Sequence, residues 1–122
     1  MNIAGNNRFP RHARVVRPQD FRQVFAQASK SGDRFWIVLG TPNDLKYPRL
    51  GLAVSRKHAP HAVDRNRLKR MIRENFRTQQ GLAAIDYVVM ARPGTSRTSN
   101  HELCQSLQRH WYALADRLPE AS

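Results

Sequence analysis

The sequence predicts a domain that mixes helices and strands, in the order helix, strands, helix, strand, helix. Apolar side chains recur at helical spacing in three segments, and short runs rich in β-branched and aromatic residues lie between them. Pro and Gly residues separate the segments. This order is typical of an α+β or an α/β sandwich. At 122 residues, the chain is expected to form a single domain over residues 1–122.

The N-terminal part is expected to hold a basic arm, a helix and a strand. Residues 1–17 carry four arginines and few apolar residues, which favours a partly extended arm. Pro18 suits the first turn of a helix of about three turns, which we expect Ser31 and Gly32 to end. A strand is predicted over residues 35–41, before a polar turn region. The apolar stripe of the helix is formed by Phe21, Val24, Phe25 and Ala28.

Two further strands and a final helix are predicted downstream. Residues 49–55 alternate large and small side chains, and the small ones leave one strand face open to a ligand or to close packing by a helix. Residues 85–91 are apolar on both faces apart from Asp86, as expected near the middle of a sheet. Ser99 and Glu102 have capping-box spacing at the start of the last helix. Its buried stripe is Leu103, Leu107, Trp111, Leu114 and Leu118.

The charge of the chain points to a polyanionic partner. Twenty-one Lys and Arg against nine Asp and Glu give a formal net charge of +12. Such a charge repels itself in a compact fold, and a polyanion neutralises it. Nucleic acid is the leading candidate. A membrane is disfavoured, because no apolar stretch approaches the ~18 residues that a spanning helix needs, and the N-terminus lacks the apolar core of a secretory signal. The single cysteine, Cys104, is expected in the core and fits a reducing cytoplasm.

Residues 62–77 predict a helix with a strongly one-sided charge. On a helical wheel of about 100° per residue, four large apolar side chains lie on one face and six polar or cationic ones on the other. A merely solvated face mixes Lys with Glu, whereas this arc has five cations and no carboxylate. Arg67 lies off the arc, and pairing with Glu74 or Asp64 is its structural alternative. The polar face comprises Arg65, Asn66, Lys69, Arg70, Arg73 and Arg77, and the apolar face Leu68, Met71, Ile72 and Phe76.

The residues of this region resemble a known signature. Arg65-Asn66-Arg67 with the following Leu-Lys-Arg-Met-Ile-Arg-Glu-Asn-Phe-Arg, preceded by Arg-Leu-Gly-Leu-Ala-Val-Ser-Arg-Lys, resembles the bacterial ribonuclease P protein family. Phe9-Pro10, the first helix, Arg34, residues 86–89 and the last helix fall at the family's places. The resemblance implies a two-layer αβββαβα sandwich of the α+β class, similar to domain 2 of ribosomal protein S5, with a left-handed βαβ crossover. It also implies a very short fourth strand, which the sequence pattern does not reveal.

The resemblance implies an RNA partner, with cleavage carried out by the RNA and binding by the protein. In this family the catalytic RNA subunit, using Mg²⁺, removes the 5′ leader from precursor tRNA. The protein subunit binds the catalytic RNA and the leader. The residues implied to contact the catalytic RNA are Arg56, Lys57, Arg65, Asn66, Arg67, Lys69, Arg70 and Arg73. A cleft between the first helix and the sheet would hold the single-stranded leader. Its implied lining is Phe21, Phe25, Trp36 and Ser55, although Phe at this spacing is ordinarily core, and one ring can pack while the other is exposed. Leu39 stands where some relatives have an aromatic residue.

The residues themselves indicate no active site in the protein. The carboxylates are scattered, and arginine is a poor general base because it stays protonated. His58 and His61 lack a nearby third ligand for zinc, so no protein metal site is expected. The runner-up is a ribosomal or other structural RNA-binding protein. A DNA-binding helix is disfavoured because the Arg/Lys face suits phosphates and not base edges, and a protein-only nuclease is disfavoured by the missing carboxylate cluster.

Overall fold

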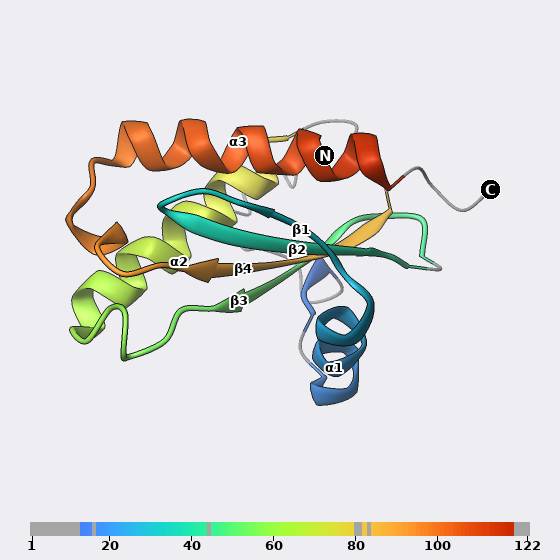
Figure 1. The fold of residues 1–122 in the computed structure, drawn as a ribbon, viewed down its shortest axis with the longest axis horizontal. Helices are drawn as coiled ribbons and strands as arrows, with labels where there is room; N and C mark the ends of the chain where they lie inside the picture. The colour runs from blue at the N-terminus through green and yellow to red at the C-terminus, as the bar shows by residue number, and fades with distance from the viewer. Residues whose placement is uncertain (1–12, 16, 44, 80–81, 83, 119–122) are drawn as a thin grey trace, which may run out of the picture.

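The computed structural model describes residues 13–15, 17–43, 45–79, 82 and 84–118. Its elements confirm the αβββαβα order (Figure 1). They are α1 (Pro18–Gln27), β1 (Ser29–Gly32), β2 (Trp36–Pro42), β3 (Arg49–Ala53), α2 (Ala62–Arg77), β4 (Ile85–Ala91), a short 3₁₀ turn η2 (Thr95–Arg97) and α3 (Asn100–Arg117). Of the predicted basic arm, residues 1–12 and 16 lie outside the described residues.

The four strands form one sheet in the order β1-β2-β4-β3. β2 pairs antiparallel with β1 and β4, whereas β3 and β4 are parallel and are joined through α2. β4 therefore lies inside the sheet, as its apolar sequence predicts. α2 and α3 cover one face of the sheet and α1 lies against the other (Figure 1).

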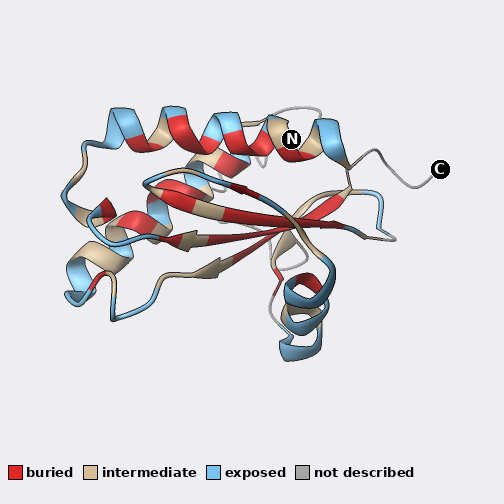
Figure 2. Cartoon of the chain, viewed as in Figure 1, coloured by how far each residue is buried: buried red, intermediate tan, exposed pale blue. Residues whose placement is uncertain are grey.

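The larger core lies between the sheet and the helices α2 and α3. Phe76, Tyr87 and Trp111 pack edge to face there, with ring centroids 5.3–5.8 Å apart. Both indole N–H groups find acceptors, because Trp36 donates to the carbonyl of Leu103 and Trp111 donates to Asn75. The buried residues of α2 and α3 lie on the sides of these helices that face the sheet (Figure 2). These contacts fix α2, so that its other side faces outward.

The prediction that Ser31 and Gly32 end the first helix is wrong. The helix ends at Gln27, and Ser29–Gly32 form the short strand β1, which pairs with β2 from Gly40 back to Ile37. Ser-Lys-Ser-Gly has little strand preference of its own, so tertiary pairing decides its conformation. The side chain of Ser31 is buried and hydrogen-bonded to Nδ1 of His110 on α3, 2.7 Å away. This contact connects the edge strand to the helix layer.

Candidate functional site

α2 has the two-sided character that its sequence predicts. Leu68, Met71, Ile72 and Phe76 are buried against the sheet and α3. Burial of four large side chains provides the main stabilisation of a helix whose mean composition is strongly polar. The remaining side chains of the wheel therefore point away from the core. We call Arg56, Lys57, Arg65, Asn66, Lys69, Arg70, Arg73 and Arg77 the basic surface.

Three arginines of α2 are engaged within the protein. Arg65 donates to the carbonyls of Ala59 and Pro60, at 3.0 and 2.9 Å, and so holds the loop before α2. Arg67 donates to Asn100 and to the carbonyl of Ser96, so the alternative of pairing with Glu74 or Asp64 is wrong.

The third arginine is Arg77, which pairs with Glu74 at 2.6 Å. Arg67 contacts α3 because its position on the wheel lies between the basic and apolar faces. It therefore has a positioning role within the fold, whatever else it contacts.

The other polar side chains of the basic surface are open to a ligand. Asn66, Lys69 and Arg70 make no hydrogen bond or ion pair with the rest of the described chain, and Asn66 and Arg70 are exposed. Arg73 is half-buried, and both burial and the neighbouring charge of Arg14 lower the pKa of its guanidinium. Arg14 lies nearby because its backbone forms a parallel bridge with Leu50 at the edge of β3. The arm thus adds a cation next to α2.

α1 creates a second surface on the opposite face of the sheet. Val24 is fully buried against Leu39 and Val88, and Phe21 is half-buried beside them. Phe25 is 50% exposed, with its ring centroid 6.4 Å from that of Phe21 and the two planes 24° apart. Phe21 is therefore the packed ring and Phe25 the accessible one.

A half-buried apolar strip continues from α1 across the sheet. The strand register places Ile37, Met90 and Ala53 side by side on this face. None of the three is fully buried, although all pack against the smaller core around Val24. We call this strip, together with Phe21 and Phe25, the α1 cleft. Sequence reasoning missed Ile37 and Met90, because β2 and β4 are apolar on both faces and their sides cannot be assigned without the register.

The prediction that Trp36 lines this cleft is wrong. Trp36 is fully buried on the opposite face of β2, where its indole contacts α3. Side chains alternate along a strand, so Ile37 takes the cleft face in its place. Ser55 follows β3 as an exposed residue and accepts a hydrogen bond from the backbone of His58. Leu39 is on the cleft side but is covered by α1.

A charged network fixes α1 and the end of the cleft. Arg49 on β3 donates two hydrogen bonds to Asp86 on β4, at 2.8 and 2.6 Å, and lies 3.5 Å from Asp20 of α1. Asn43 donates to the same carboxylate at 2.8 Å. The hydrogen bonds with Asp86 raise the pKa of Arg49, with burial opposing them. Asp86, the one charged residue of β4, therefore serves to orient neighbouring elements.

The loop after β3 places His58 and His61 beside cations. With Lys57 and Arg97 they line a pocket of about 310 Å³ between this loop and the segment that follows β4. Within the described residues, no group of three or more His, Cys, Asp and Glu side chains is placed to hold a metal ion. Of the helices described, none combines the length and the apolar character needed to cross a membrane.

Comparison with known proteins identifies the family. The ribonuclease P family model matches residues 9–115. The chain belongs to the ribonuclease P protein family. The ribonuclease P protein component of Methylococcus capsulatus is 48% identical over 115 residues, covering 93% of this chain and 90% of the relative. The protein component of Nitrosococcus oceani is 44% identical over 114 residues, covering 93% and 96%.

Solved structures of the family share the fold. The ribonuclease P protein of Staphylococcus aureus superposes with a TM-score of 0.76 at 30% identity, covering 84% of this chain and 94% of that one. The Thermotoga maritima protein superposes with a TM-score of 0.74, also at 30% identity, covering 82% and 96%. The α+β architecture implied by the sequence resemblance is thus that of this family.

Proposed function

We propose that this chain is the RNA-binding subunit of ribonuclease P, the endoribonuclease of tRNA 5′ processing. In this proposal the basic surface of α2 binds the catalytic RNA, and the α1 cleft binds the single-stranded leader of precursor tRNA. The observation that carries the proposal is the one-sided cationic face of α2, on which Lys69 and Arg70 have no partner in the described chain. Repulsion between such cations is offset when phosphates lie against them.

The α1 cleft is chemically suited to a single strand. Phe25 offers an exposed ring on which a base can stack, and every base has a face for stacking, so the contact tolerates different leader sequences. Ile37 and Met90 extend this apolar surface across the sheet. The leader would therefore lie along the strip, with Phe21 as the packed wall that fixes the position of Phe25.

The chemistry is assigned to the RNA subunit. Mg²⁺ bound there would supply the activation of water for hydrolysis of the phosphodiester bond. In this proposal the role of this chain is to bind and orient the two RNAs. Arginine remains protonated and binds phosphate through a planar pair of donors. The lone cysteine fits a reducing compartment, and we place this activity in the cytoplasm.

Reconstitution tests the proposal. The chain is mixed with a bacterial ribonuclease P RNA transcript and precursor tRNA at low, near-physiological Mg²⁺, and 5′ cleavage is followed. We expect cleavage at the mature 5′ end to be faster than with the RNA alone. A chain that binds the RNA without changing cleavage would instead be a structural RNA-binding protein, and the proposal would be wrong.

A further inference from the structure

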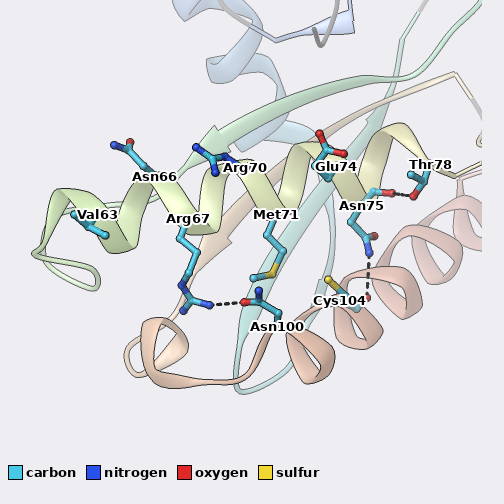
Figure 3. Close-up of a pocket in the computed structure, with 10 residues that line it drawn as sticks. All are labelled: Val63, Asn66, Arg67, Arg70, Met71, Glu74, Asn75, Thr78, Asn100 and Cys104. Carbon is cyan, nitrogen blue, oxygen red and sulfur yellow. Dashed lines mark hydrogen bonds between the residues drawn. The ribbon is translucent and has the colours of Figure 1, made fainter. Parts of the chain in front are cut away.

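α2 and α3 leave a groove between them that shares Asn66 and Arg70 with the basic surface and is lined otherwise by residues outside both RNA surfaces. It has a volume of about 680 Å³, within the range of about 300–1,000 Å³ that small-molecule pockets occupy. Figure 3 shows side chains from α2 lining one side and Asn100 and Cys104 from α3 lining the other. The groove runs alongside α2, so it adjoins the basic surface.

The floor of the groove is apolar and contains two sulfur atoms. Met71 of α2 and Cys104 of α3 both direct their sulfur atoms into the space between the helices (Figure 3). Val63 adds an isopropyl group that is 79% exposed at the N-terminal end of α2. Sulfur is polarisable and makes favourable contacts with aromatic rings. The floor therefore suits a flat aromatic group.

The rim of the groove combines free polar groups with fixed ones. Asn66 and Arg70, one helical turn apart, line it without any partner in the described chain. Opposite them, Arg67 is held by Asn100 and Ser96, and Asn75 is held by Trp111 and the carbonyl of Cys104. These hydrogen bonds keep the two helices in place around the opening. The rim thus offers a free cation and a free amide on a preformed frame, together with the carboxylate of Glu74, which is paired with Arg77.

We propose that this groove receives one unstacked nucleobase of the RNA that binds the basic surface. The inference rests on the proposed function, since it takes the catalytic RNA as the occupant. A nucleotide matches the groove because its base is flat and aromatic while its phosphate is anionic. The base would lie on Met71 and Cys104, the phosphate against Arg70, and the amide of Asn66 within reach of a base edge. Sequence-specific RNA recognition commonly uses unpaired bases of this kind.

Cys104 provides the test, because it is the only cysteine of the chain and is partly exposed. The rate of its alkylation by N-ethylmaleimide is measured in the free protein, in complex with a bacterial ribonuclease P RNA transcript, and in complex with a fully paired RNA duplex. Binding is measured separately by gel shift in the same buffer. We expect the transcript to slow alkylation by about tenfold or more, as burial of the thiol under a base requires, and the duplex to leave the rate near that of the free protein.

In a reciprocal experiment, the N-ethylmaleimide adduct on Cys104 fills the groove before RNA is added. Alkylated wild-type protein should bind the transcript about tenfold more weakly than untreated protein, which is the loss of one good base contact. The matched control is Cys104→Ser, whose affinity should be the same before and after treatment. Circular dichroism verifies that the adduct leaves the fold intact.

Four results would overturn the inference. Transcript binding with unchanged Cys104 reactivity, or equal protection by the paired duplex, would do so while leaving the proposed function standing. A thiol that does not react in the free protein would show that the groove is closed. Failure of the transcript to bind at all would reject the proposed function, and the inference with it.

Discussion

The ring of Phe21 lies directly over Gly51. A Cβ atom at Gly51 would lie 2.9 Å from Cε1 of Phe21 and 3.1 Å from Cβ of Val15. Carbon atoms do not approach that closely without displacement. The small residues of β3 therefore serve close packing by α1 at this position, one of the two uses that the sequence leaves open.

Gly51→Ala should accordingly destabilise the fold and move Phe21. Overpacking of this kind costs typically about 1–3 kcal/mol, measurable by urea denaturation. Gly32→Ala is the matched control on the same face of the sheet, since its nearest neighbour would lie at an ordinary 3.5 Å. Equal losses in the two variants would contradict the close packing of Phe21 on Gly51.

The two phenylalanines of α1 should separate stability from leader binding. Phe25→Ala removes a half-exposed ring and should change the free energy of unfolding by less than about 1 kcal/mol. It should still weaken binding of precursor tRNA relative to mature tRNA, because only the precursor carries a leader.

Phe21→Ala is the comparison for this experiment, and it should cost more stability because Phe21 packs on Gly51 and against the smaller core around Val24. The measurement is the ratio of precursor to mature tRNA affinity for the reconstituted holoenzyme. If Phe25→Ala reduces both affinities equally, the leader does not stack on this ring.

The sequence predicts the elements that local periodicity determines, and it misses the element that distant contacts determine. α2 and β4 are found with their observed bounds, because the hydrophobic period of each is decided by its own residues. β1 is not found, because Ser-Lys-Ser-Gly is held by pairing with β2 and by His110, 79 residues away from Ser31.

The same reasoning applies to the candidate site. The side of Trp36 cannot be assigned from a run that is apolar on both faces, and only the register shows Ile37 in the cleft. The wheel correctly separates Arg67 from the basic face. It cannot show that Arg67 contacts Asn100, because that partner comes from a different helix. Local periodicity thus predicts which residues of α2 share a face. Tertiary contacts determine which of its cations have a hydrogen-bond partner within the protein.

The ion pair between Arg49 and Asp86 should matter far more than the one between Arg77 and Glu74. Asp86→Ala leaves a mostly buried guanidinium without its two hydrogen bonds and should cost about 3 kcal/mol. Glu74→Ala removes a similar pair at the surface and should cost about 0–1 kcal/mol. Thermal or urea unfolding compares the two variants, and similar losses would mean that Asp86 does not anchor β3 and β4.

His110 should make stability depend on pH. Burial lowers its pKa below the ordinary value of 6.5, although the carboxylate of Asp33, 3.2 Å from Nε2, opposes the shift. Below pH 6.5 the unfolded chain therefore binds more protons at this residue than the folded chain, and stability falls as the pH falls.

The wild-type protein should lose unfolding free energy between pH 7 and about pH 5, and His110→Gln should lose less over the same interval. Asp33 acts at lower pH. Burial raises its pKa, but hydrogen bonds from Ser106 and from the backbone of Trp36 and Phe35 outweigh this and lower the pKa below 3.8. Its contribution is lost only as the pH falls through that lowered pKa. Parallel pH profiles for wild type and His110→Gln would show that this histidine is not the titrating group.

The salt dependence of RNA binding tests the central claim most directly. Lys69→Ala with Arg70→Ala removes two cations that have no partner in the described chain, and Arg109→Ala with Arg117→Ala removes two from α3. Affinity for a bacterial ribonuclease P RNA transcript is measured from low to high salt. If α2 holds the RNA, the first variant binds more weakly and its log–log salt slope is shallower by about two, one for each lost phosphate contact. The α3 variant should keep a slope close to that of the wild type. Equal slopes in the two variants would mean that net charge, and not the basic surface of α2, binds the RNA.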